Sequence, residues 1–121
     1  MKTKKTLILG ASTNSTRYSY LAACRLVIKG HPIVNVGMKN GEIAEQPIER
    51  PEKIHKDIDT ITMYVGPQNQ KDLYDYVIKT NPKRIIFNPG SENPELEKLA
   101  NKNGIKTIEA CTLVLLSTNQ F

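Results

Sequence analysis

The amino-acid sequence predicts an α/β fold in which a five-stranded parallel sheet is doubly wound and covered by helices on both faces. Short apolar runs of the buried-strand kind alternate with segments of helical periodicity along the whole chain. Turn residues, mostly glycine, proline and asparagine, separate these segments. Because strands that alternate with helices pair in parallel through right-handed crossovers, the expected architecture is Rossmann-like. A length of 121 residues corresponds to one domain with one core, spanning residues 1–121.

The five expected strands are short runs of β-branched and aliphatic residues. They lie at residues 6–10, 33–37, 60–65, 84–87 and 105–109. Between the second and third of these strands, residues 38–58 contain two prolines and many charged residues. We expect a loop in this segment, with one short helix near residues 51–55.

Four helices are expected between and after these strands. They cover residues 18–29, residues 67–80, residues 94–103 and a short part of residues 112–121. The first helix has apolar residues on one face and ends at Gly30, which is typical of a helix C-terminus. The third begins with Asn93 as a capping residue and Pro94 in the first helical position.

The composition favours an anionic ligand or partner without identifying it. The sequence has 17 lysine and arginine residues against 12 acidic residues, which gives a formal net charge of +5. Solvated lysines that serve only solubility explain this balance equally well. No apolar run approaches the ~20 residues that cross a membrane, and the apolar part of "MKTKKTLILG" is too short for a signal peptide. We therefore expect a cytoplasmic protein.

The cysteines and histidines show no pattern typical of a disulfide framework or a metal site. We expect no bound metal. His31 belongs to the turn after the first helix, and His55 falls in a charged loop where we expect it to be solvated.

The most informative residues follow the predicted strands. In a doubly wound sheet, ligands bind at the carboxyl ends of the strands, near the point where the winding direction changes. The segments that follow the five strands read GASTNSTRYSY, GMKNGE, VGPQNQ, NPGSEN and EACT. Their glycines permit close approach of a ligand to the backbone, and their hydroxyl and amide groups supply hydrogen bonds. Ordinary polar turns of an α/β protein are the alternative interpretation.

The first of these loops has the features of a phosphate site. Hydroxyl and amide side chains between Gly10 and Arg17 can donate to phosphate oxygens. The free N–H groups near Ser19, at the start of the following helix, add a positive dipole end. The Arg17 guanidinium can bind a phosphate through two hydrogen bonds. Its alternative role is a surface arginine paired with a nearby carboxylate.

Two features distinguish this loop from an NAD site. Gly10 is alone, so the loop lacks the G-x-G-x-x-G fingerprint of dinucleotide-binding proteins. An NAD site also has an acid at the end of the second strand, where it binds the ribose hydroxyls. Here no acid occurs before Glu42, and Lys39 precedes it. The pattern therefore favours a nucleotide phosphorylated on its ribose, and both NADP and coenzyme A meet that condition.

Four stretches of the sequence resemble a known family: "LGAS…RYSY", "KGHPIVNVG", "NPKRIIFNPGSENPE" and "EACTLVLL". Together they are similar to the small, single-domain CoA-binding proteins of the CoA-binding-2 type. The fold of these proteins is similar to the CoA-binding domain of succinyl-CoA synthetase. The resemblance covers nearly the whole chain.

The resemblance implies coenzyme A, or an acyl-CoA, as the ligand. The diphosphate would lie on residues 10–17, the adenosine near residues 36–39, and the pantetheine arm past residues 65–67 and 88–90. The expected contact residues are Gly10, Ala11, Ser12, Thr13, Asn14, Arg17, Tyr18, Ser19, Val36, Gly37, Lys39, Val65, Gly66, Pro67, Asn88, Pro89, Gly90 and Cys111.

No set of base, acid and nucleophile is apparent among these residues, so we expect binding without catalysis. Cys111 follows the last strand near the start of a helix, where a thiol ionises more readily, and it could meet the thiol of CoA. A small buried packing residue is the alternative role for Cys111. Two other functions remain open. An NADP-dependent reductase module would need a further domain for its substrate, and a basic nucleic-acid-binding protein would bind at physiological salt.

Overall fold

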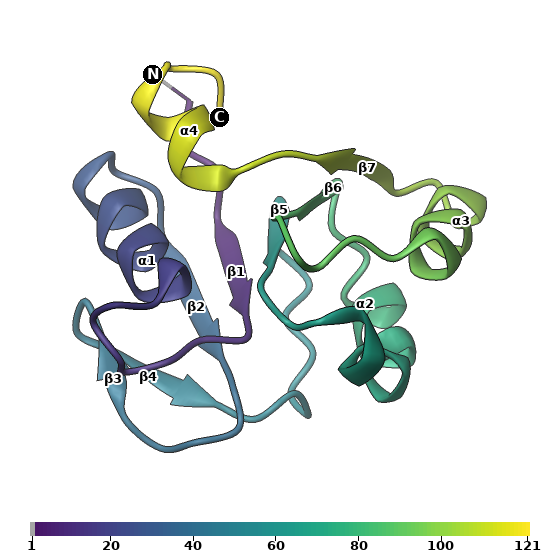
Figure 1. The fold of residues 1–121 in the computed structure, drawn as a ribbon, viewed down its shortest axis with the longest axis horizontal. Coiled ribbons are helices and arrows are strands. Elements are labelled where there is room, and N and C mark those ends of the chain that lie inside the picture. Colours follow the sequence, from purple (N-terminus) through teal and green to yellow (C-terminus); the bar gives the residue numbers. More distant parts are fainter. Residues whose placement is uncertain (1) are drawn as a thin grey trace.

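The computed structural model describes residues 2–121, and within them the chain forms one mixed sheet flanked by helices (Figure 1). The strands are β1 (Thr6–Leu9), β2 (Ile33–Val36), β3 (Glu42–Ile43), β4 (Gln46–Glu49), β5 (Thr60–Met63), β6 (Arg84–Phe87) and β7 (Lys106–Glu109). The α-helices are α1 (Tyr18–Ile28), α2 (Tyr74–Thr80), α3 (Pro94–Lys102) and α4 (Thr112–Ser117). Two short 3-10 turns, η1 (Pro67–Asn69) and η2 (Lys71–Leu73), precede α2.

The order of the strands in the sheet is β3-β4-β2-β1-β5-β6-β7. Every neighbouring pair is parallel except β3 and β4. The chain winds outward from β1 to β4 and then returns to β5 on the other side of β1. The switch point therefore lies between β1 and β5, as a doubly wound sheet requires. The predicted fold class is confirmed, but the predicted number of strands is wrong, because the sheet has 7 strands rather than five.

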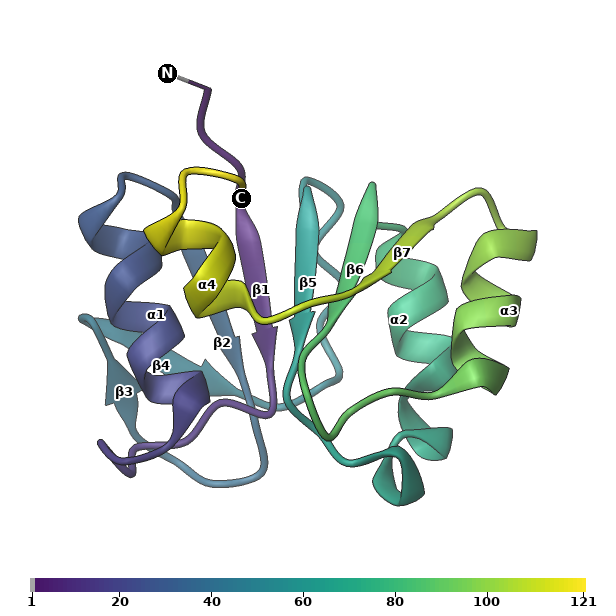
Figure 2. The ribbon, with the colours of Figure 1, turned by 45° about the horizontal axis from the view of Figure 1, so that its top comes forward.

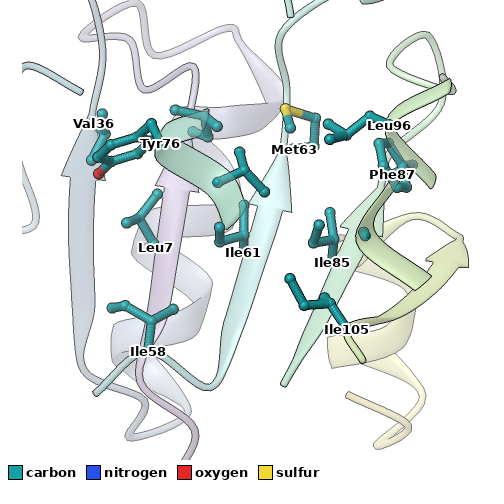
Figure 3. Packing of buried hydrophobic residues seen from close by; sticks show 13 residues of the cluster. Leu7, Val36, Ile58, Ile61, Met63, Tyr76, Ile85, Phe87, Leu96 and Ile105 are labelled. Carbon is teal, nitrogen blue, oxygen red and sulfur yellow. The ribbon is translucent and has the colours of Figure 1, made fainter. Parts of the chain in front are cut away.

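Helices cover both faces of the sheet, α1 and α4 on one and α2 and α3 on the other (Figure 2). Successive residues of a strand point to opposite faces, so Leu7 joins the cluster under α2 and α3 while Ile8 joins the cluster under α1 and α4. Both side chains are fully buried. Figure 3 shows the first cluster, which contains Ile61 of β5 and in which Phe87 of β6 lies beside Leu96 of α3. Buried aliphatic strands on both faces explain why these segments read as continuous apolar runs.

The segment between β2 and β5 differs from the prediction. Instead of a loop with a helix near residues 51–55, it forms the β3–β4 hairpin followed by turns. The two turn residues, Ala44 and Glu45, have positive φ angles of 51° and 68°. Such turns usually contain asparagine or glycine, so residues 44 and 45 carry no hairpin signal in the sequence. Pro47 is accommodated because β4 lies near the edge of the sheet.

A buried asparagine holds this hairpin against the sheet. The Asn35 side chain in β2 is fully buried, and its Nδ2 donates to the carbonyl oxygens of Ile43 at 3.1 Å and Gln46 at 3.0 Å. These acceptors flank the two-residue turn. The hairpin therefore has a fixed position beside β2, which places the residues after β4 at the carboxyl edge of the sheet.

One predicted helix start agrees with the structure and another differs from it. The Asn93 side chain accepts hydrogen bonds from the N–H groups of Glu95 and Leu96, so it caps α3 as predicted. The predicted helix from Pro67 begins as 3-10 turns and becomes α-helical only at Tyr74.

Within residues 2–121, no helix is long and apolar enough to cross a membrane.

Candidate functional site

Glycines bring three loops into backbone contact at the carboxyl edge of the sheet. Gly10 has a φ of +99°, and a Cβ at this position would lie 3.0 Å from the carbonyl carbon of Tyr64. A Cβ on Gly37 would lie 2.5 Å from the backbone oxygen of Ala11. The loops after β1, β2 and β5 can therefore pack this closely only because these residues lack side chains.

The loop after β1 leads into α1 through a compact turn. The Asn14 side-chain oxygen accepts from the N–H of Thr16 at 3.0 Å and from its hydroxyl at 2.7 Å. The Asn14 backbone oxygen accepts from the N–H of Arg17 at 3.0 Å. No side chain caps α1, and its first turn has no acidic residue. The first N–H groups of this 11-residue helix are therefore available to an anion.

The Arg17 side chain lies at this helix start and is exposed. Within the part of the chain that the structure describes, it takes part in no ion pair. The alternative role as a surface arginine paired with a carboxylate therefore has no partner among these residues. The guanidinium is free to bind a ligand beside the open helix end.

The loop after β2 contains Lys39 and is held by an arginine that the sequence analysis did not single out. Arg50, just after β4, donates from Nη1 to the Gly37 oxygen at 3.3 Å and from Nη2 to Asn40 Oδ1 at 3.1 Å. Lys39 lies between these two acceptors and is exposed. The sequence offers no signal for Arg50, because its segment has the pattern of a loop with one short helix. The β3–β4 hairpin brings it to the carboxyl edge.

A buried glutamine joins the loops after β5 and β6. Gln70 is fully buried, and its Nε2 donates to the backbone oxygens of Val65 at 2.8 Å and Ser91 at 2.7 Å. Its Oε1 accepts from Asn93 Nδ2 at 2.9 Å. These bonds fix the segments that were predicted to contact the pantetheine arm. The sequence offered only a glutamine in a polar turn, which carries no specific signal.

Asn88 and Cys111 lie where β6 and β7 end. Asn88 is 2% exposed, and its Nδ2 donates to Thr62 Oγ1 at 2.8 Å and to the Met63 oxygen at 2.9 Å. Its Oδ1 accepts from the N–H of Thr112 at 2.8 Å. The Asn88 side chain is thus occupied by contacts within the protein. Cys111 precedes the 6-residue helix α4 and is half-buried.

The predicted contact residues differ in their exposure. The exposed ones are Thr13, Asn14, Arg17, Tyr18, Lys39, Pro67, Pro89 and Gly90. The half-buried ones are Gly10, Ser12, Val65, Gly66 and Cys111. The buried ones are Ala11, Ser19, Val36, Gly37 and Asn88. The exposed and half-buried residues are accessible at the carboxyl edge, whereas the buried residues lie beneath the surface there.

His55 has a different environment from the one predicted. Its side chain is only 14% exposed, and its Nε2 lies 2.5 Å from Glu49 Oε1 at the end of β4. The prediction of a solvated histidine is therefore wrong. The charge of Glu49 also affects Tyr76. Burial of the Tyr76 hydroxyl, together with this carboxylate, raises the pKa of Tyr76 to about 12. The His55–Glu49 pair fastens the segment after β4 to the sheet.

Two hollows of the described surface lie away from the carboxyl edge. One, of about 320 Å³, lies beside the start of β1, and another, of about 270 Å³, lies between α1 and α4.

The sequence model of the CoA binding domain family matches residues 4–117. The chain belongs to this family of CoA-binding domains. The resemblance inferred from the sequence motifs is thereby confirmed, and a CoA-binding role is the function that the family supports. Among curated proteins, none matches the chain.

Several solved structures are similar to this CoA-binding domain. A crystal structure of an uncharacterized protein is 47% identical, with a TM-score of 0.97 and coverage of 100% of both chains. A hypothetical protein from Pyrococcus horikoshii is 21% identical, with a TM-score of 0.86 and coverage of 97% of this chain and 84% of that one. A dinucleotide-forming acetyl-coenzyme A synthetase from Ca. Korarchaeum cryptofilum is 15% identical, with a TM-score of 0.72 and coverage of 88% of this chain and 25% of that one. The last two likenesses support the fold alone.

Proposed function

We propose that this chain is a non-catalytic module that binds coenzyme A, or an acyl-CoA, reversibly at the carboxyl edge of its sheet. The observation that carries the proposal is the uncapped start of α1, with the free Arg17 side chain beside it. Membership of the CoA-binding domain family supports the choice of ligand.

The diphosphate of CoA would lie on the loop between Gly10 and Arg17. The N–H groups at the start of α1 point at the place where an anion is most stabilised by the helix dipole. The exposed hydroxyl of Thr13 and the half-buried hydroxyl of Ser12 add donors. The loop contains no acidic residue that would repel the diphosphate. These features fit the charge of the ligand.

The adenosine end would lie on the loop after β2. Lys39 is exposed there and can pair with the phosphate on the ribose of CoA. Arg50 holds the loop through its bonds to the Gly37 oxygen and Asn40. This arrangement favours a ribose phosphate over a free ribose hydroxyl, for which an acidic residue would be needed.

The pantetheine arm would cross the loops that Gln70 joins, passing Val65 to Pro67 and then Pro89 and Gly90. Both loops are fixed before the ligand binds, so little conformational entropy is lost on binding. Cys111 lies beyond them at the end of β7 and would be near the thiol or acyl end. No base or acid is placed there for acyl transfer, which is why we propose binding without catalysis.

The test is calorimetry of the full chain with CoA, acetyl-CoA, NADP and NAD as separate ligands. We expect CoA and acetyl-CoA to bind at least about tenfold more tightly than NADP, and NAD to bind weakest, because only CoA combines all three groups that the site accommodates.

Three results would contradict the proposal. Equal affinity for NAD and CoA would show that the site does not use the ribose phosphate. Preference for NADP would favour the reductase module instead. A gel shift with nucleic acid at physiological salt would favour the third function, since binding through phosphates alone weakens steeply with salt.

A further inference from the structure

A second candidate site lies at the opposite edge of the sheet, where the parallel strands begin. A cavity of about 320 Å³ is lined there by Lys2, Lys4, Lys29 and His31, with Leu116 and Phe121 as its apolar walls. We refer to it as the basic cavity. In Figure 2 the last residues of the chain lie beside the start of β1, whereas the Gly10 loop leaves β1 at its other end. The basic cavity is therefore separate from the proposed CoA site.

Positive charge is concentrated at the basic cavity. Its three charged side chains are lysines, and the half-buried Arg84 lies close to them. The nearby carboxylate, Asp59, lies outside the lining and accepts a hydrogen bond from Thr60 at 2.7 Å. Burial lowers the pKa of Lys4, and the charges of Arg84 and Lys2 lower it further. An anion in the cavity would relieve this repulsion.

The aromatic ring of Phe121 forms a flat apolar surface among these cations. The Arg84 guanidinium carbon lies 4.5 Å from the centre of the ring, and Lys4 Nζ lies 5.7 Å from it. The centre of the His31 ring is 5.0 Å away. Leu116 extends the apolar part of the lining. The basic cavity thus combines charged and apolar walls, as sites for small organic molecules usually do.

Several donors at the basic cavity have unused capacity. Arg84, which lies outside the lining with its guanidinium against the Phe121 ring, donates from Nε to Thr60 Oγ1 at 2.8 Å. His31 Nδ1 accepts from the N–H of Lys4 at 3.0 Å, so the neutral ring carries its proton on Nε2. Lys4 Nζ donates one of its three protons, to the Phe121 oxygen at 2.7 Å. The remaining protons of Lys4 Nζ and the Nε2 proton of His31 are donors in the lining that a ligand oxygen would accept.

We infer that the basic cavity binds a small organic anion that carries a carboxylate or phosphate group on a flat apolar body. The anionic group would lie among the lysines and His31, and the apolar body would lie against Phe121 and Leu116. Inorganic anions would lack the apolar contact, and nucleotides would exceed the volume of the cavity, which is at the low end of ligand sites. The inference goes beyond the proposed CoA binding and does not depend on it.

The experiment is an NMR titration of the full chain with phenyl phosphate, benzoate, inorganic phosphate and uncharged benzyl alcohol. We expect phenyl phosphate and benzoate to shift the amide signals of residues 2–4, His31 and residues 116–121. Whichever of these two probes binds more tightly shows whether the cavity prefers a phosphate or a carboxylate group. Inorganic phosphate and benzyl alcohol should each bind at least about tenfold more weakly, because each lacks one of the two contacts.

Two variants and one matched control test the assignment to these lysines. Lys4→Gln and Lys29→Gln should each weaken binding of the stronger probe about tenfold, since each removes one charge-assisted contact. Lys98→Gln, on the exposed surface of α3, should not change it. Lys29 is exposed, so its variant should fold even if Lys4→Gln does not.

Absence of shifts at the basic cavity, equal affinity for inorganic phosphate, or the same affinity in all three lysine variants would overturn the inference. A parallel titration with CoA distinguishes the two sites, because CoA should shift the amide signals of residues around Gly10, Arg17 and Lys39. Failure of one titration leaves the other unaffected.

Discussion

The side-chain oxygen of Asn88 accepts a hydrogen bond from the backbone N–H of Thr112 at 2.8 Å, which joins the end of β6 to the first turn of α4. The same side chain donates to Thr62 and Met63 of β5. One buried asparagine therefore holds together three elements at the carboxyl edge. This explains why a residue predicted to contact the ligand is almost wholly inaccessible.

Replacing Asn88 should destabilise the protein. Asn88→Ala leaves the buried Thr112 N–H without its acceptor, which costs about 1–3 kcal/mol. It also removes the side-chain bonds to Thr62 and to the Met63 oxygen, which contribute about 1 kcal/mol each. We expect a loss of about 2–4 kcal/mol in the free energy of unfolding, measured by urea denaturation. Asn69→Ala, at an exposed position, is the matched control. Equal midpoints for the two variants would show that the Asn88 bonds contribute nothing to stability.

Arg17→Ala should weaken CoA binding without changing the stability of the free protein. A hydrogen bond between charged groups contributes about 1.5–3 kcal/mol, so calorimetry should show a dissociation constant raised about 10- to 150-fold. The melting temperature without ligand should hardly change, because the side chain is exposed and in no ion pair within residues 2–121. Arg25→Ala, an exposed arginine near the other end of α1, should bind normally. If Arg17→Ala bound CoA normally, the diphosphate would not bind at this loop.

Lys39→Gln should reduce the preference of the site for a ribose phosphate. Wild-type protein should bind CoA more tightly than dephospho-CoA, because Lys39 pairs with the additional phosphate. In the variant we expect this difference to shrink by about 1–2 kcal/mol, with little change in affinity for dephospho-CoA. Lys53→Gln, at an exposed position in the segment after β4, is the control. An unchanged ratio of the two affinities in Lys39→Gln would place the ribose phosphate elsewhere.

Gly37→Ala should damage both stability and binding. Its Cβ would lie 2.5 Å from the backbone oxygen of Ala11, so the loops after β1 and β2 would have to separate. We expect a loss of about 1–3 kcal/mol in unfolding free energy, together with weaker CoA binding. Gly104→Ala is the control, because its φ is +80° but its Cβ would meet nothing within 4 Å. It should cost about 1–2 kcal/mol of stability and leave CoA affinity unchanged. If Gly37→Ala bound CoA as tightly as wild type, the close packing of these two loops would not be needed for CoA binding.

The fold class was predictable because its signals are local. Asn93 caps α3 through its own side chain, and the apolar runs of β1 and β6 are buried on both faces of a parallel sheet. The hairpin between β2 and β5 was not predictable in this way. Its turn uses Ala44 and Glu45 in a conformation that usually requires asparagine or glycine, and contacts with Asn35 in another strand hold it in place.

The loops at the carboxyl edge could likewise be located from the sequence, but the contacts that hold them together could not. Gly10 and the loop after it are recognisable because they follow an apolar strand. Arg50 and Gln70 support the site through contacts with residues 10 or more positions away, such as Asn40 and Ser91. Such contacts depend on the tertiary arrangement, and a single sequence contains no local signal for them.

The stability of the protein should fall as the pH decreases below about 6.5, and His31 should account for part of that fall. Burial lowers the pKa of His31 from its ordinary value of 6.5, and the charges of Lys4 and Arg84 lower it further. The unfolded chain then takes up a proton at a higher pH than the folded protein does. Stability from the neutral ring is therefore fully present above the unfolded pKa of 6.5 and is lost as the pH falls through the folded pKa.

Urea denaturation between pH 8 and pH 5, in buffers without phosphate or carboxylate, measures this effect. We expect the midpoint for wild type to fall over this range and the midpoint for His31→Gln to fall less, because glutamine does not titrate. The lowered pKa of Asp57, caused first by its hydrogen bond from Lys5, does not interfere, since that carboxyl titrates below its ordinary value of 3.8. Parallel curves for wild type and His31→Gln would show that His31 takes up its proton equally well in the folded and unfolded chains, against the burial and the neighbouring cations that the structure places around it.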